Sequence, residues 1–200
     1  MTPEEAKQKY EEILAGLSPE LREVFLRLQA EAKPRPKLEC LSASTLNSLE
    51  SEDLDTAIVD YVERQISQSE DRHARLFELP RGLQVFYLSF LVEAEVMNGG
   101  FNQFFWNSSG EFAEAVAPAL RQLGAGEAAE IFERAFAVAK IEAEKATLNP
   151  APRTLEAFST SYETTQLNGF DVAFCEHALH FPSLRLHLAR HHTASLCDDG

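Results

Sequence analysis

The chain has 200 residues, and its 32 acidic residues outnumber the 18 basic ones, which gives a net charge of −14. A protein that binds nucleic acid directly needs a basic surface to displace counterions. The composition therefore argues against direct nucleic-acid binding, while strong acidity favours solubility and a basic protein as partner.

The cysteines and the N-terminus bear on the compartment. Cys40, Cys175 and Cys197 lack CxxC spacing, which argues for reduced thiols and against a disulfide scaffold. The first residues show no basic segment followed by an apolar one, so no signal peptide is predicted. We expect a cytoplasmic protein.

Two helices are predicted at the start of the chain, over residues 3–16 and 19–32. Each follows a capping signal with proline at the first helical position, Thr2-Pro3 and Ser18-Pro19. The second helix has an apolar stripe made of Leu21, Val24, Phe25 and Leu28.

The run Lys33-Pro34-Arg35-Pro36-Lys37 ends this pair of helices. It predicts an N-terminal helical appendage and linker over 1–37 and a main domain over 38–200. We expect the helices within 1–32 to pack on the outside of the main domain.

The main domain also shows only helical patterns, which predicts an all-α fold. Ser51 is expected to cap a helix to about Ser67, with Leu54, Ile58, Tyr61 and Val62 inward and Asp53, Asp60 and Glu63 on the opposite face. A longer helix, about 80–98, is apolar almost all round. Its centre, 83–97, is too short and too acidic to span a bilayer and is expected to be the buried core of the domain.

The remaining predicted elements follow in order. Ser108-x-x-Glu111 resembles a capping box that starts a helix ending at Gly124. An amphipathic helix is expected over 127–146 and a break at Asn149-Pro150-Ala151-Pro152. Shorter helices are expected at Leu155–Tyr162, Asp171–His180 and Pro182–His192.

The segment from Glu93 to Gly110, which we call the signature segment, is the least ordinary part of the chain. Paired glycines suit positive φ or a close approach of two backbones. Asn98 and Gly99 are expected to end the buried helix in a left-handed C-cap. Phe101, Phe104 and Phe105 share one helical face and are expected to be largely buried. The amides of Asn98, Asn102, Gln103 and Asn107 would then satisfy backbone groups at the break.

The signature segment resembles the DNA-mimic protein family, whose shared domain is otherwise of unknown function. The residues that carry the resemblance are Glu95, Asn98, Gly99, Gly100, Phe101, Gln103, Phe104, Phe105, Asn107, Ser108 and Gly110. Met97 stands where such sequences often have a second asparagine. The resemblance covers about residues 45–150. It implies an acidic, all-helical homodimer whose characterised relative binds a DNA-binding protein in place of DNA.

Two further clusters are open to chemical interpretation. Glu93 and Glu95 lie in a stretch with neither Lys nor Arg from Gly82 to Leu120. Burial there would raise a carboxyl pKa and suit acid–base chemistry. The alternative is that one faces solvent while the other accepts hydrogen bonds from the amides of the glycine turn.

The C-terminal segment contains Cys175, His177, His180, His187, His191 and His192, and His187 and His191 share a helical face. The spacing matches no zinc motif, so we expect neither a metal nor another cofactor. With no recognisable catalytic motif, the chain is not expected to be an enzyme.

Added to the acidic composition, the family resemblance implies an acidic protein-interaction module that mimics DNA and occupies the DNA-binding surface of a regulatory or nucleoid protein. The expected acidic face is Glu50, Glu52, Asp53, Asp55, Asp60, Glu63, Glu70, Asp71 and Glu78, with Arg64, Arg72 and Arg75 as the nearby cations. DNA carries one charge per roughly 1.7 Å of axis, so one helix is insufficient and several helices or a dimer must contribute.

Two alternatives stay open. One is a helical ligand-binding protein or enzyme that uses Glu93, Glu95 and the Asn/Gln cluster. The other is an immunity-type protein that neutralises a basic toxin.

Overall fold

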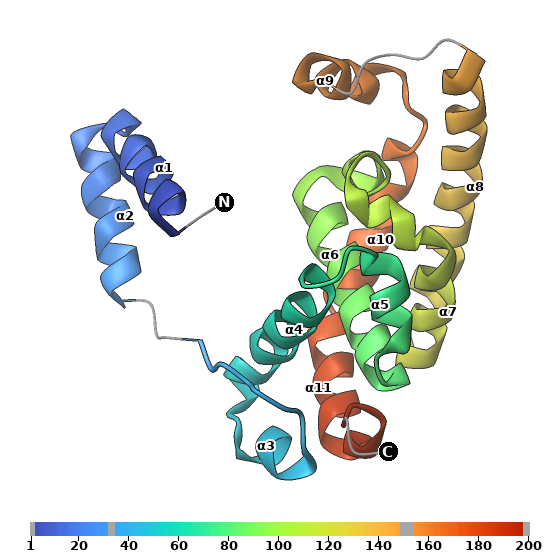
Figure 1. Ribbon diagram of the computed structural model, residues 1–200. Coiled ribbons are helices and arrows are strands. Elements are labelled where there is room, and N and C mark those ends of the chain that lie inside the picture. Colours follow the sequence, from blue (N-terminus) through green and yellow to red (C-terminus); the bar gives the residue numbers. More distant parts are fainter. Residues whose placement is uncertain (1–2, 32–34, 149–153, 198–200) are drawn as a thin grey trace. The chain divides into compact units, whose positions relative to one another are not determined.

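The computed structural model describes residues 3–31, 35–148 and 154–197. Within these ranges the protein is all-α, as predicted, and contains no β-strand. The chain divides into two compact units, Met1–Arg35 and Pro36–Gly200. Figure 1 shows the helices of both.

The first unit is a helical hairpin of α1 (Pro3–Gly16) and α2 (Pro19–Glu31). Ser18 caps α2 as predicted, because its Oγ accepts a hydrogen bond from the Leu21 N–H at 3.3 Å. The other predicted cap, Thr2, lies outside the described residues. The rings of Tyr10 and Phe25 pack with centroids 6.3 Å apart, yet Leu21, Val24 and Phe25 are exposed. That this hairpin packs on the main domain stays a prediction.

The second unit is built around α6 (Arg81–Trp106), the apolar helix in the middle of this unit in Figure 1. Its first half is buried over Gly82–Ser89. Helices α4 (Ser51–Ser67), α7 (Ala113–Leu123), α10 (Asn168–Ala178) and α11 (Phe181–His191) all pack against it. The prediction of a central helix over 83–97 is confirmed, and the helical path continues beyond it across a kink.

Two short helices, α3 (Ala43–Ser48) and α5 (Arg72–Glu78), flank α4 in the chain. The predicted inward residues of α4 are buried, but its predicted cap is wrong. Ser51 is already helical, and Glu50 occupies the N-cap without a side-chain hydrogen bond.

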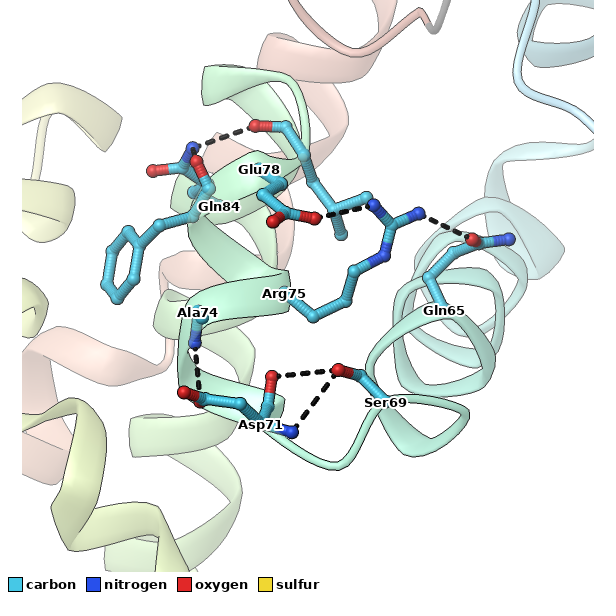
Figure 2. Close-up of polar contacts among 9 residues, drawn as sticks. Gln65, Ser69, Asp71, Ala74, Arg75, Glu78 and Gln84 are labelled. Atoms are coloured by element: carbon cyan, nitrogen blue, oxygen red, sulfur yellow. Dashed lines mark hydrogen bonds and ion pairs between the residues drawn. The ribbon is translucent and has the colours of Figure 1, made fainter.

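Hydrogen bonds made by side chains stabilise the connection between α4 and α5 (Figure 2). Asp71 caps α5 by accepting from the Ala74 N–H at 2.8 Å. Arg75 reaches both Gln65 of α4 and Glu78 of its own helix. Buried Gln84 donates to the carbonyls of Phe77 and Leu79, which satisfies the end of α5.

The predicted capping box at Ser108 and Glu111 is also wrong. Residues Ser108–Phe112 form a 3₁₀ turn, η1, and its N-cap, Asn107, makes no side-chain capping bond. The polar side chains available there bond to Glu95 instead. Helix α7 follows and ends at Gly124, whose φ of 95° confirms the predicted left-handed cap.

The remaining elements follow α7 in the chain. Helix α8 (Gly126–Leu148) packs on α7 and α10. The predicted break at 149–152 lies outside the described residues. Helix α9 (Leu155–Thr164) is capped by Thr154 and buries none of its residues. A short 3₁₀ turn, η2 (Thr193–Ser195), follows α11. None of the helices in the described ranges is long and apolar enough to cross a membrane.

Candidate functional site

The glycine pair of the signature segment bends α6 sharply. Gly99 has φ −153° and ψ 28°, and Gly100 has φ 69° and ψ −178°. The second pair of angles belongs to a region that essentially only glycine occupies. The predicted break is therefore present, but the predicted left-handed C-cap is wrong, because helix resumes at once. A Cβ at Gly100 would also collide with the Asp171 carboxylate.

Residues far along the chain satisfy the backbone groups that the bend frees. Asp171 of α10 accepts a hydrogen bond from the Phe101 N–H at 2.9 Å. Tyr162 of α9 donates to the Gly99 carbonyl at 2.7 Å. Burial raises the pKa of Asp171, and the Phe101 N–H only partly opposes this. Sequence reasoning missed both residues, since nothing local connects them to a turn some 60–70 residues away.

The amides of the signature segment do not serve the bend as predicted. Gln103 Nε2 and Asn107 Nδ2 donate to Glu95 Oε2 at 2.7 and 2.9 Å. Ser109 Oγ donates to Glu95 Oε1 at 2.7 Å. The expectation that a glutamate takes hydrogen bonds from the glycine-turn amides is therefore corrected, because Glu95 takes them from side chains and Asp171 takes the backbone bond.

The two remaining amides bind nearby groups. Asn98 Nδ2 donates to the Gln103 side-chain oxygen at 3.0 Å, and Asn102 Nδ2 donates to Ser161 Oγ at 2.8 Å. Asn102 therefore joins α9 to the signature segment.

The aromatic residues of the signature segment form the core beside the bend. Phe101 and Phe104 are fully buried, and Phe105 is half-buried. All three rings contact Phe132 of α8, with centroids 5.5–5.9 Å apart. The prediction of burial is confirmed for the first two rings, while Phe105 keeps one side toward solvent.

Glu93 forms an ion pair, although the sequence around it contains neither Lys nor Arg. Arg185 of α11 donates to Glu93 Oε2 at 2.6 Å and makes a two-pronged ion pair with Asp55 of α4, both bonds 2.7 Å long. The Arg185 side chain is only 1% exposed. Burial raises the pKa of Glu93, with Arg185 opposing it. The acid–base interpretation, which needs a buried carboxylate without a cation, is thus overturned for Glu93 by a residue 92 positions away.

The nine residues of the expected acidic face do not form one free row. Asp55 binds Arg185, Glu63 binds both Tyr87 and Arg72, Glu78 binds Arg75, and Asp71 caps α5. Glu63 was expected opposite the buried face of α4, yet it accepts the Tyr87 hydroxyl at 2.6 Å. Glu50, Glu52 and Glu70 are exposed, and Asp53 and Asp60 are half-exposed.

The C-terminal histidines gather without forming a metal site in the described residues. The rings of His187 and His191 lie 4.5 Å apart, and His192 is 5.9 Å from His187. His177 instead faces Glu127 at 3.4 Å. Across residues 3–31, 35–148 and 154–197, no three His, Cys, Asp or Glu side chains are placed to hold a metal ion.

A groove of about 320 Å³ lies where the signature segment meets α8. From the signature segment and η1 it is lined by Phe105, Asn107, Ser108, Gly110 and Glu111, and from α8 by Phe136 and Lys140, among others. The Lys140 ammonium lies 4.2 Å from the centroid of the Phe136 ring. Two exposed residues of the signature segment, Asn107 and Ser108, lie in this groove.

Comparison with known proteins gives one relationship. The family model described as DMP19-like protein matches residues 77–192. This range contains the whole signature segment and, from the expected acidic face, only Glu78. No curated protein and no solved structure matches the chain.

Proposed function

Because the chain belongs to the DMP19-like protein family, we propose that it is a DNA mimic whose acidic surface occupies the DNA-binding surface of a basic protein. The observation that carries this proposal is the placement of the charge. Residues 36–200 hold 25 of the 32 acidic residues and 12 of the 18 basic ones, a net charge of −13, and the N-terminal unit holds only −1.

The carboxylates available for a partner come from two parts of this unit. Glu50, Glu52 and Asp53 precede the range that the family model matches. They lie at the start of α4, where no side-chain carboxylate acts as a cap. Within the match, Glu111, Glu114 and Glu130 are exposed on η1, α7 and α8. Mimicry of DNA needs charge from several helices, because carboxylates three or four residues apart on one helix are about 5–6 Å apart.

The use of Glu93 and Glu95 inside the fold supports the interaction role over the enzyme alternative. A catalytic carboxylate must reach a substrate, whereas these two are held by Arg185 and by three neutral donors. A basic toxin as partner would use the same acidic surface, and competition by DNA separates the two cases. We retain the homodimer as part of the proposal, to be measured by analytical ultracentrifugation.

The test starts with the immobilised full-length protein and nuclease-treated lysate of its native host. A captured protein should elute steeply with salt, because exposed charges are screened, and it should be released by duplex DNA. Binding that resists salt and that DNA does not compete would contradict mimicry.

Two neutralised variants with equal charge changes then locate the surface. One carries Glu50→Gln, Glu52→Gln and Asp53→Asn, and the other carries Glu111→Gln, Glu114→Gln and Glu130→Gln. If mimicry is a property of the matched domain, the second variant loses more affinity for the captured protein. Equal circular dichroism spectra and unfolding midpoints confirm that both variants are folded.

A further inference from the structure

The groove at the end of the signature segment has features that the proposed function has not used. Asn107 and Ser108 are exposed there, whereas Phe101, Asn102 and Phe104 are buried. Binding of a basic partner through charge alone would give little selectivity, because exposed ion pairs are worth little and are screened by salt. A formed groove beside that charge offers a specific contact.

The ring at the base of this groove is held in a fixed orientation. Phe136 stacks on Phe105 with centroids 5.8 Å apart and planes 10° apart. Both rings also contact the fully buried Phe132, at 6.2 and 5.9 Å. Since close-packed cores keep side chains in place, the Phe136 ring keeps its orientation without a partner.

The same ring already binds a cation. Lys140, one turn further along α8, places its ammonium 4.2 Å from the ring centroid, well inside the range of a cation–π contact. Lys140 is exposed, so its ammonium stays hydrated and the contact is weak and reversible. The chain's own lysine thus marks a position where a partner's cation would be attracted.

Two carboxylates contribute negative charge to this groove. Glu111 lines it, and Asn107, which also lines it, donates to the Glu95 carboxylate at 2.9 Å. A guanidinium suits both the Phe136 ring and the carboxylates better than an ammonium does, because it is planar, stacks on aromatic faces and binds carboxylates through two parallel hydrogen bonds.

We propose that this groove receives an arginine side chain of the basic partner, which displaces Lys140 from the Phe136 ring. This inference rests on the proposed function and names the contact that makes it selective. Lys140 then acts as an internal competitor, and removing it strengthens binding.

The test uses a fluorescein-labelled peptide of eight arginines and fluorescence anisotropy at low salt. Phe136→Leu is expected to weaken binding by about threefold to tenfold, because the cation–π contact is lost while apolar volume is kept. Phe170→Leu is the control, since Phe170 carries its own cation, Arg134 at 5.3 Å, and does not line the groove. A peptide of eight lysines should bind more weakly than the arginine peptide and respond less to Phe136→Leu.

Lys140→Ala provides the opposite effect with a matched control. It should strengthen binding of the arginine peptide by about twofold to fivefold. Lys145→Ala changes the net charge equally on the exposed surface of the same helix, outside the groove, and should have a smaller effect. Chemical denaturation of each variant shows that the changes do not arise from unfolding.

The outcomes separate this inference from the proposed function. If the peptide binds with steep salt dependence but each variant equals its control, the groove is not the arginine site, while the acidic surface keeps its proposed role. Absence of peptide binding at low salt also contradicts the proposal that the groove binds arginine. If duplex DNA does not release the host partner, the proposed function of DNA mimicry is contradicted, whatever the peptide experiment shows.

Discussion

Glu93 and Glu95 stand two residues apart on α6, and the protein stabilises them in different ways. Glu93 meets a buried guanidinium from α11, which also binds Asp55 of α4. Glu95 meets three neutral side chains that follow it within 14 residues. The first arrangement joins three helices through charge, and the second shapes one bend through hydrogen bonds. The difference predicts that the two sites fail differently when altered.

The largest effect is expected from Arg185→Met, which leaves two largely buried carboxylates without a cation. Removing one partner of a buried ion pair costs about 3–5 kcal/mol of the free energy of unfolding. Urea denaturation measures it. The control is Arg121→Met, which removes an exposed pair with Glu133 and should change little. If both variants lose equal stability, the ion cluster is not what holds α4, α6 and α11 together.

Removing all three charges of the buried ion cluster tests whether uncompensated charge causes the loss of stability. Adding Asp55→Asn and Glu93→Gln to Arg185→Met removes the buried charges together with their cation. Since the main cost of the single variant is the uncompensated charge, the triple variant should regain part of the lost stability in the same measurement. Further loss would show that the cluster acts through packing rather than charge.

Gly100→Ala tests the bend beside the Glu95 network. Its φ of 69° with ψ of −178° strains any other residue, and the new Cβ would meet Asp171. We expect a loss of about 3 kcal/mol, from strain and displacement of Asp171. Gly126→Ala is the control, because it has open space around it. A Gly100→Ala variant as stable as wild type would contradict the geometry of the bend.

Glu95→Gln weakens the amide network while keeping its shape. An NH2 group replaces one carboxylate oxygen, so either Ser109 or the Gln103 and Asn107 pair loses its acceptor, and the remaining oxygen carries no charge. The expected loss is about 1–2 kcal/mol in thermal or urea unfolding. Glu114→Gln on the exposed side of α7 should be nearly neutral. A neutral Glu95→Gln would show that the amides find other partners readily.

The smallest expected effect concerns pH. Burial raises the pKa of Asp171 above its ordinary value of 3.8. The folded state therefore binds the proton more tightly, and this contribution to stability is complete below 3.8 and lost as the pH rises through the folded pKa. Asp171→Asn keeps an oxygen for the Phe101 N–H, so it should flatten stability against pH in that window. An unchanged slope would show that Asp171 titrates normally in the folded protein.

Local pattern was sufficient for the longer helices of this fold, but the sequence did not predict the short helices α3 and α5. The spacing of apolar residues located the α4 region and α6, and the caps at Ser18 and Gly124 are where the sequence placed them. The failures at Ser51 and Ser108 have different causes. Ser51 already lies inside α4, whereas the neighbours of Ser108, Asn107 and Ser109, bond to Glu95. A capping signal describes what a side chain is able to bind, and it does not show whether a stronger acceptor, such as Glu95, lies nearby in space.

The sequence by itself determined the helical class, the charge, the bend at the glycine pair and the burial of Phe101 and Phe104, because each follows from composition or from residues within a few turns. Only the tertiary structure decided which carboxylates remain available. Arg185 takes up Glu93 and Asp55, and Tyr87 takes up Glu63, through contacts that span 92, 130 and 24 residues. A charge is free or engaged according to what folding brings beside it, and no local pattern contains that information.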